Sequence, residues 1–151
     1  MWQPLGMAPE EARARFAAAR VARLATADAA GVPHLVPVVF VVDVSVDGDV
    51  LYSAVDAKPK RTTALRRLAN VQANPHVALL VDVYDDADWS ALWWVRADGE
   101  GHVLRPGAAE ARRAVGLLVA RYPQYRTTPP TGPVLAVRVR RWTGWTAQPD
   151  T

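Results

Sequence analysis

The chain has 151 residues, of which 50% are hydrophobic and 22% are charged, and it contains no cysteine. This length suits a single domain with a real core, and no apolar run approaches the roughly 18 residues that a membrane span needs. Without cysteine, disulfides, thiol catalysis and thiolate metal sites are excluded. The N-terminus lacks the basic and apolar blocks of a signal peptide, so we expect a cytoplasmic protein that does not bind membranes.

The N-terminal third predicts a helix followed by a hairpin. Residues 1–8 are expected to be flexible, whereas residues 9–20 begin with Pro and two glutamates and end in Arg, as helices often do. From residue 21, two β-branched runs are separated by the turn sequence at 28–31. The second run, 35–44, is so continuously apolar that we expect one strand buried on both faces, as in a barrel wall or an interface.

The rest of the chain predicts further strands and helices joined by turns and loops. We expect a turn at 46–50, a strand at 50–54, a helix after residue 61 that stops at 74–75, and a strand at 76–84. An acidic loop at 85–88 precedes a strand at 92–104 that is interrupted at 98–101. A helix over 106–121 and a strand over 134–142 complete the chain. Five or six strands joined mainly by tight turns predict a mainly β (α+β) fold, an antiparallel barrel or sandwich.

The cations are unevenly distributed between the two residue types. Sixteen of the 18 are arginine, and the only two lysines, Lys58 and Lys60, lie in one loop with Arg61. This loop joins the end of a strand to the start of a helix, where cations, the Ser53 hydroxyl and a helix N-terminus suit a phosphate. A solvated basic turn is the alternative interpretation.

Other site classes find less support in the sequence. The three histidines, His34, His76 and His102, lack metal-site spacing, so we expect no metal, and neither a Rossmann nor a P-loop glycine pattern occurs. The net charge is +3, but the arginines are scattered among acidic residues, which argues against nucleic-acid binding. Five of the six tryptophans fall after residue 88. They are expected either to pack in the core or at an interface, or to form a flat wall over a planar ring.

Three runs of sequence carry a family resemblance: ARLATADAAGVPHLVPVVF, then DVLYSAVDAKPKRTTALRRLANVQANPHVALLVDVY, then WWVRADGEGHVL. In their order and spacing they resemble the pyridoxamine 5′-phosphate oxidase-like, FMN-binding split β-barrel family, over about residues 10–146. More narrowly, they resemble its actinobacterial branch of oxidoreductases that depend on the deazaflavin coenzyme F420. The resemblance implies an antiparallel split β-barrel with flanking helices, and a homodimer with the cofactor at the subunit interface.

The resemblance also implies which residues bind the cofactor. The second strand would line the ring, the next strand would end beside the phosphate, and the basic loop would hold that phosphate. One residue after the fourth strand would reach the partner's cofactor, and one on the last strand would border the pocket. The ring-lining residues would be His34, Pro37, Val38 and Val39, and the residues beside the phosphate would be Tyr52, Ser53 and Ala54. The loop residues that hold the phosphate would be Lys58, Lys60 and Arg61. Trp89 would reach the partner's cofactor, and Trp142 would border the pocket.

The implied activity is hydride transfer between coenzyme F420 and an unidentified organic substrate. His34 or Tyr52 could donate a proton, the alternative being a structural role for each, and no residue is assigned as catalytic. Flavin-binding oxidases of the family carry an Arg or Lys on the second strand close to the ring, where this chain offers only His34 and apolar residues. That difference favours the deazaflavin over FMN. An FMN-dependent oxidoreductase or flavin reductase is one alternative, and a protein that binds the cofactor or a tetrapyrrole without turnover is another.

Overall fold

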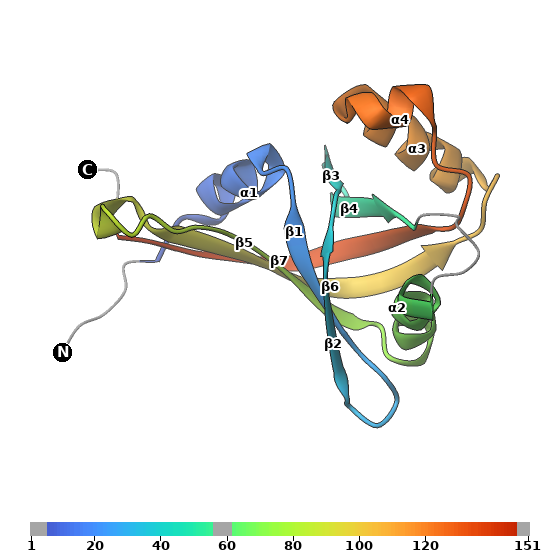
Figure 1. Ribbon diagram of the computed structural model, residues 1–151, viewed down its shortest axis with the longest axis horizontal. Helices are drawn as coiled ribbons and strands as arrows, with labels where there is room; N and C mark the ends of the chain where they lie inside the picture. Colours follow the sequence, from blue (N-terminus) through green and yellow to red (C-terminus); the bar gives the residue numbers. More distant parts are fainter. Residues whose placement is uncertain (1–5, 56–61, 148–151) are drawn as a thin grey trace.

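The fold is one seven-stranded antiparallel sheet flanked by helices, as seen in a computed structural model that describes residues 6–55 and 62–147 (Figure 1). The sheet order is β2-β1-β5-β6-β7-β4-β3. Its strands are β1 (Ala22–Ala27), β2 (Pro33–Val38), β3 (Val41–Ser45), β4 (Gly48–Ala54), β5 (His76–Val83), β6 (Trp93–Leu104) and β7 (Val134–Thr146). The helices are α1 (Pro9–Ala18), α2 (Thr62–Ala73), the 3-10 turn η1 (Trp89–Ala91), α3 (Ala109–Arg121) and α4 (Pro123–Thr127).

The two edges of this sheet are held together by the chain itself. β2 and β3 lie at opposite edges, yet only Val39 and Phe40 separate them in sequence. Three peptide steps span at most about 11 Å, so the sheet must curl until its edges meet. Figure 1 shows β2 running directly into β3 across the front of the sheet. The mainly β, antiparallel split-barrel prediction is therefore confirmed.

The prediction of a single strand over residues 35–44 is wrong, and within one chain the run is not buried on both faces, which leaves the interface alternative as a prediction. The run is two strands, which raises the strand number from the expected five or six to seven. Along β2, Val38 is buried, whereas Leu35 is 66% exposed. An edge strand has a neighbour on one side only, so an apolar sequence there does not require burial on both faces.

The interior of the barrel is filled by aliphatic side chains from six strands and by Phe16 of α1. The Phe16 ring lies 4.9 Å from Phe40 and 5.2 Å from Trp142, centroid to centroid. The fully buried side chains include Leu24, Leu51, Leu79, Val95 and Val137. A second cluster on the other side of the sheet packs β4 and β7 against α3, which places Tyr52 and Ala136 against Ala111 and Ala114.

The predicted interruption at residues 98–101 is a β-bulge rather than a break, because β6 continues through it with a register shift between Asp98 and Gly99. Gly101 has a separate role. A Cβ atom there would lie 2.8 Å from Cγ1 of Val71, so the glycine lets α2 approach β6. The glycines that looked like a turn are thus positions where backbone and helix come close.

Two element boundaries, the end of β7 and the start of α3, also differ from prediction. Within the segment expected to be flexible, the Met7 amide donates to the Gly144 carbonyl at 3.0 Å, and Gly6 bridges Trp145. β7 therefore extends to Thr146 instead of stopping at Trp142. The helix expected from residue 106 begins at Ala109, and α4 was not predicted. None of the helices in the described residues is long and apolar enough to cross a membrane.

Candidate functional site

The end of the barrel between β2 and α2 contains polar side chains that lack partners. In the part of the chain that the structure describes, three buried side-chain atoms have no hydrogen-bond partner: His34 Nδ1, Arg67 Nε and Thr143 Oγ1. Buried polar atoms are nearly always paired in folded proteins, so each exception needs an explanation. Two of the three, on His34 and Arg67, flank one contact between β1 and α2.

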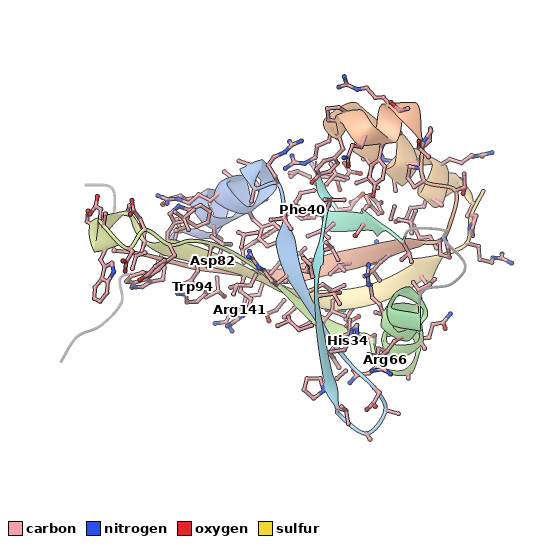
Figure 2. The ribbon with its side chains drawn as sticks, in the orientation of Figure 1. His34, Phe40, Arg66, Asp82, Trp94 and Arg141 are labelled. Carbon is pink, nitrogen blue, oxygen red and sulfur yellow. The ribbon has the colours of Figure 1, made fainter. Side chains whose placement is uncertain are left out.

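That contact is a hydrogen bond from Asn70 Nδ2 to Thr26 Oγ1 at 3.1 Å, and both residues are buried. His34 is the cross-strand partner of Thr26, and the two side chains lie on the same face of the sheet. Arg66 and Arg67 precede Asn70 by four and three residues, so they lie one turn away on the same side of α2. Figure 2 labels His34 on β2 and Arg66 on α2, at this end of the barrel.

The two arginines bring positive charge to this end of the barrel. Neither has an ion pair with any residue within 6–55 or 66–147, and Arg66 is exposed while Arg67 is half-buried. Burial lowers the pKa of the Arg67 guanidinium from its ordinary value, and Tyr125 on α4 opposes that shift. Arginine nevertheless stays protonated in proteins. A partly desolvated guanidinium without a counter-ion would gain free energy from an anion.

This donor set fits an anionic, ring-containing cofactor. Arg66 and Arg67 can neutralise a phosphate, His34 offers a ring nitrogen, and Val36 and Val38 continue the same face of β2 as an apolar wall. No three His, Asp or Glu residues in the described part of the chain are grouped closely enough to hold a metal ion.

The residues expected on β4 have their side chains engaged elsewhere. The Tyr52 hydroxyl donates to Glu110 Oε2 at 2.8 Å, on the α3 side, and Ala54 packs on that same side with Leu118 and Tyr122. Burial, then the contact with Glu110, raises the pKa of Tyr52 far above its ordinary value. The Tyr52 hydroxyl is thus already engaged with Glu110 on the α3 side of the sheet.

Ser53 points to the other side of β4, toward the barrel interior, where its hydroxyl donates to the Val39 carbonyl at 2.8 Å. Val39 thus lies at the crossover between the sheet edges. Val38 is buried in the core, and Pro37 is exposed on the outer face of β2. Of the four residues expected to line a ring, the structure places His34 and Val38 on one face of β2 and Pro37 on the other.

The two tryptophans lie far apart. Trp142 Nε1 donates to Asp49 Oδ2 at 2.8 Å, and its ring packs on Phe16 under α1. Trp89 is 66% exposed and belongs to η1, which lies at the far end of the β5–β6 ribbon from α2 (Figure 1). Within one chain, Trp89 does not approach His34. The expected phosphate ligands Lys58, Lys60 and Arg61 lie outside the described residues.

The prediction from sequence did not include Arg66, Arg67 and Asn70. One signal was present, since these three residues recur at the spacing of one helical turn directly after the basic loop. The amphipathic pattern of α2 was interpreted only through its apolar residues. The partner of Asn70, Thr26, lies 44 residues earlier in the chain and could not be paired with it from sequence.

Comparison with known proteins identifies the fold. The family model described as pyridoxamine 5′-phosphate oxidase matches residues 8–146. No curated protein matches the chain by sequence.

Similar solved structures share this fold at low sequence identity. An FAD-binding protein from Mesorhizobium loti has a TM-score of 0.70 at 18% identity, covering 93% of this chain and 95% of its own. A conserved hypothetical protein from Mycobacterium tuberculosis has a TM-score of 0.66 at 21% identity, with coverages of 96% and 91%. The heme storage protein HutZ from Vibrio cholerae has a TM-score of 0.63 at 16% identity, with coverages of 93% and 95%.

Proposed function

The chain belongs to the pyridoxamine 5′-phosphate oxidase family, and from this premise we propose that it is a cytoplasmic oxidoreductase that uses the deazaflavin coenzyme F420. It transfers hydride between this cofactor and a small organic substrate. The observation that carries the proposal is the pair of unpartnered buried atoms, His34 Nδ1 and Arg67 Nε, on either side of the contact between Asn70 and Thr26.

The cofactor, when bound, supplies the ring carbon that accepts or donates hydride. The residues of the chain bind the cofactor, orient it and exclude water from it. Arg67 and Arg66 hold the anionic part of the cofactor with charge-assisted hydrogen bonds. His34 Nδ1 either donates to or accepts from the ring, and it can exchange a proton with a group bound there. The apolar side chains of Val36 and Val38 keep water from that face of the ring.

The preference for a deazaflavin over FMN comes from the charge on β2. FMN accumulates negative charge on its ring when reduced, which a nearby cation stabilises. β2 carries no lysine or arginine, and its one polar ring, His34, is half-buried. An FMN-dependent oxidoreductase or flavin reductase on the same fold is the first alternative.

We also propose that the working form is a homodimer with the cofactor at the subunit interface. The outer face of β2, β1 and β5 carries exposed apolar side chains, Leu35 of β2 and Leu80 of β5. Exposed apolar side chains on a sheet face are typical of an interaction surface. In such a dimer, Trp89 of the β5–β6 ribbon would reach the partner's cofactor. Sedimentation of the purified chain at micromolar concentration tests this directly.

A second candidate function is tetrapyrrole binding without turnover. His34 supports it, because a half-buried imidazole with an unpartnered ring nitrogen can ligate a haem iron. The fold is shared with the heme storage protein HutZ at 16% identity.

Titration of the purified protein with coenzyme F420, FMN and haemin separates the three candidates. We expect the largest change in cofactor absorbance or fluorescence with F420. Arg67→Gln is expected to weaken F420 binding about tenfold, because a charge-assisted hydrogen bond contributes about 1.5–3 kcal/mol. Arg112→Gln, on an exposed face of α3, is the matched control. Tight FMN binding without F420 affinity supports the first alternative, and a haemin Soret shift lost in His34→Ala supports the second.

Catalysis is tested separately from binding. Reduced F420 is mixed with the protein and with quinones, enones or biliverdin, and the return of the oxidised cofactor is followed by absorbance. An enzyme accelerates this oxidation with at least one class of acceptor. Tight binding without acceleration across the panel contradicts the oxidoreductase proposal and leaves a cofactor-binding protein.

A further inference from the structure

A groove lies at the opposite end of β1 from His34. It has a volume of about 320 Å³ and lies between the C-terminal end of α1, the start of β1 and the adjoining ends of β5 and β6. Its lining includes Arg15, Arg20, Arg23, Val81, Asp82 and Trp93. Figure 2 places Asp82 on the β5 ribbon beneath α1. The volume lies at the lower end of the range of about 300–1,000 Å³ that small-molecule sites occupy.

The charges that line the groove are three arginines against one aspartate. Arg20 has no carboxylate partner in the described residues, since its guanidinium donates to the Arg121 carbonyl at 3.0 Å and lies over the Tyr122 ring. Arg23 and Asp82 approach to 3.4 Å, but their side chains are 49% and 42% exposed, so this ion pair is weak. Two cationic groups, Arg20 and Arg23, are therefore available to an anion.

The rest of the groove is apolar and aromatic. Arg15 is paired with Glu11 at 2.8 Å and lies over the Trp93 ring, with Cζ 5.3 Å from the centroid. Val81 is buried, and Ala18 and Ala19 contribute small side chains to the α1 side. This surface suits a flat hydrocarbon ring better than a fully hydrated inorganic anion.

We propose that this groove binds a small aromatic carboxylate. The ring lies against Trp93 and Val81, and the carboxylate accepts hydrogen bonds from Arg20 and Arg23. The site is distinct from the proposed cofactor site, because it uses the start of β1 and the end of β5, whereas His34 faces Thr26 near the end of β1. It stands whether or not the proposed cofactor is correct.

The test is a titration of the full-length ¹⁵N-labelled protein with 2-naphthoate, followed by NMR. The indole N–H signal of Trp93, assigned by its absence from Trp93→Phe, is expected to shift and saturate. The uncharged analogue 2-naphthalenemethanol is expected to bind at least tenfold more weakly. Equal binding of the two compounds, or no shift of the Trp93 signal, would overturn the proposal.

Two variants at the rim of the groove have opposite expected effects. Asp82→Asn removes the only carboxylate in the lining and is expected to tighten 2-naphthoate binding about threefold, which a misfolded protein cannot do. Arg23→Gln is expected to weaken binding by about three- to tenfold. Arg112→Gln, outside the groove, is the control and leaves affinity unchanged. If Asp82→Asn has no effect, the carboxylate of 2-naphthoate does not lie near Arg23, which contradicts the proposed binding mode.

A second copy of this chain is the competing occupant, because the acidic residues 85–88 could also meet these arginines. Sedimentation of Arg23→Gln distinguishes the two. The expected result is unchanged assembly with weaker naphthoate binding. If the variant instead changes the subunit assembly and wild-type protein ignores naphthoate, the groove is part of an interface and the small-molecule proposal is wrong.

Discussion

The two polar junctions of this barrel differ in how completely their hydrogen bonds are satisfied. At the crossover between β2 and β3, the Tyr122 hydroxyl accepts from the Phe40 amide at 3.1 Å and from Arg121 Nε at 3.2 Å. It also lies 2.8 Å from the Phe40 carbonyl and 3.1 Å from the Arg20 carbonyl, either of which can accept its proton. Beside it, Ser53 satisfies the Val39 carbonyl. At the β2–α2 end, His34 Nδ1 and Arg67 Nε have no partner among the residues that the structure describes.

We interpret the satisfied junction at the crossover as structural and the unsatisfied junction at the β2–α2 end as a ligand site. The crossover cannot join the sheet ladder, so two hydroxyl groups replace the missing backbone partners and hold the two sheet edges together. At the β2–α2 end, His34 and Arg67 are only half-buried, yet one buried polar atom of each lacks a partner among the described residues. Such atoms cost stability in the free protein, and a bound ligand can recover that cost. Variants at the two junctions should therefore behave in opposite ways.

Tyr122→Phe is expected to have the largest effect on stability. It removes the group that satisfies both the amide and the carbonyl of Phe40, and we expect the free energy of unfolding to fall by about 2–4 kcal/mol. Urea denaturation followed by tryptophan fluorescence measures this. Tyr84→Phe, at a 63% exposed tyrosine, is the control and should change stability by less than about 0.5 kcal/mol. Equal effects would mean that the crossover does not depend on Tyr122.

Gly101→Ala tests the support for the other junction. The added methyl group would overlap Val71 Cγ1, and we expect a loss of about 1–3 kcal/mol as α2 moves away from β6. Because α2 carries Asn70 and Arg67, cofactor affinity should fall as well. The double variant Gly101→Ala with Val71→Ala restores space and should recover part of the affinity. If it does not, the position of α2 does not control the site.

Tyr52→Phe tests the polar contact beneath α3. Near pH 7 the loss of the hydrogen bond to Glu110 should cost about 1 kcal/mol. The folded-state pKa of Tyr52 is raised above that of the unfolded chain, so its contribution is fully present below about pH 10 and is lost as the pH rises further. The stability difference between wild type and variant should therefore shrink above pH 10. A pH-independent difference would contradict the assignment.

Arg67→Met is expected to have the smallest effect on stability and the opposite sign. Replacing this half-buried guanidinium, whose Nε has no partner among the described residues, with an apolar side chain should leave the free energy of unfolding unchanged or raise it by up to about 1 kcal/mol. The same variant should weaken cofactor binding about tenfold. Thermal denaturation with and without F420 measures both effects. A strongly destabilised variant would show that Arg67 is structural, as Tyr122 is.

Much of the fold could be predicted from local sequence. The helix at α1, the turn after β1, and the strands β4 and β5 follow from capping residues, Gly-containing turns and β-branched runs. The division of residues 35–44 into two strands could not, because the run contains neither Gly nor a polar residue at the crossover. Only the hydroxyl groups of Tyr122 and Ser53, 82 and 14 residues from their partners, mark the break.

The sequence by itself determined the fold class, an antiparallel mainly β chain, the absence of thiols and the presence of one basic loop. It also carried the family resemblance that the family match confirms. The tertiary structure decided which side chains meet. It placed Tyr52 and Ser53 on opposite faces of β4, with each hydroxyl already donating, and left His34 Nδ1 and Arg67 Nε without a partner in the described part of the chain. The physical reason is that hydrogen-bond satisfaction depends on groups brought together from distant parts of the chain, which residue spacing does not record.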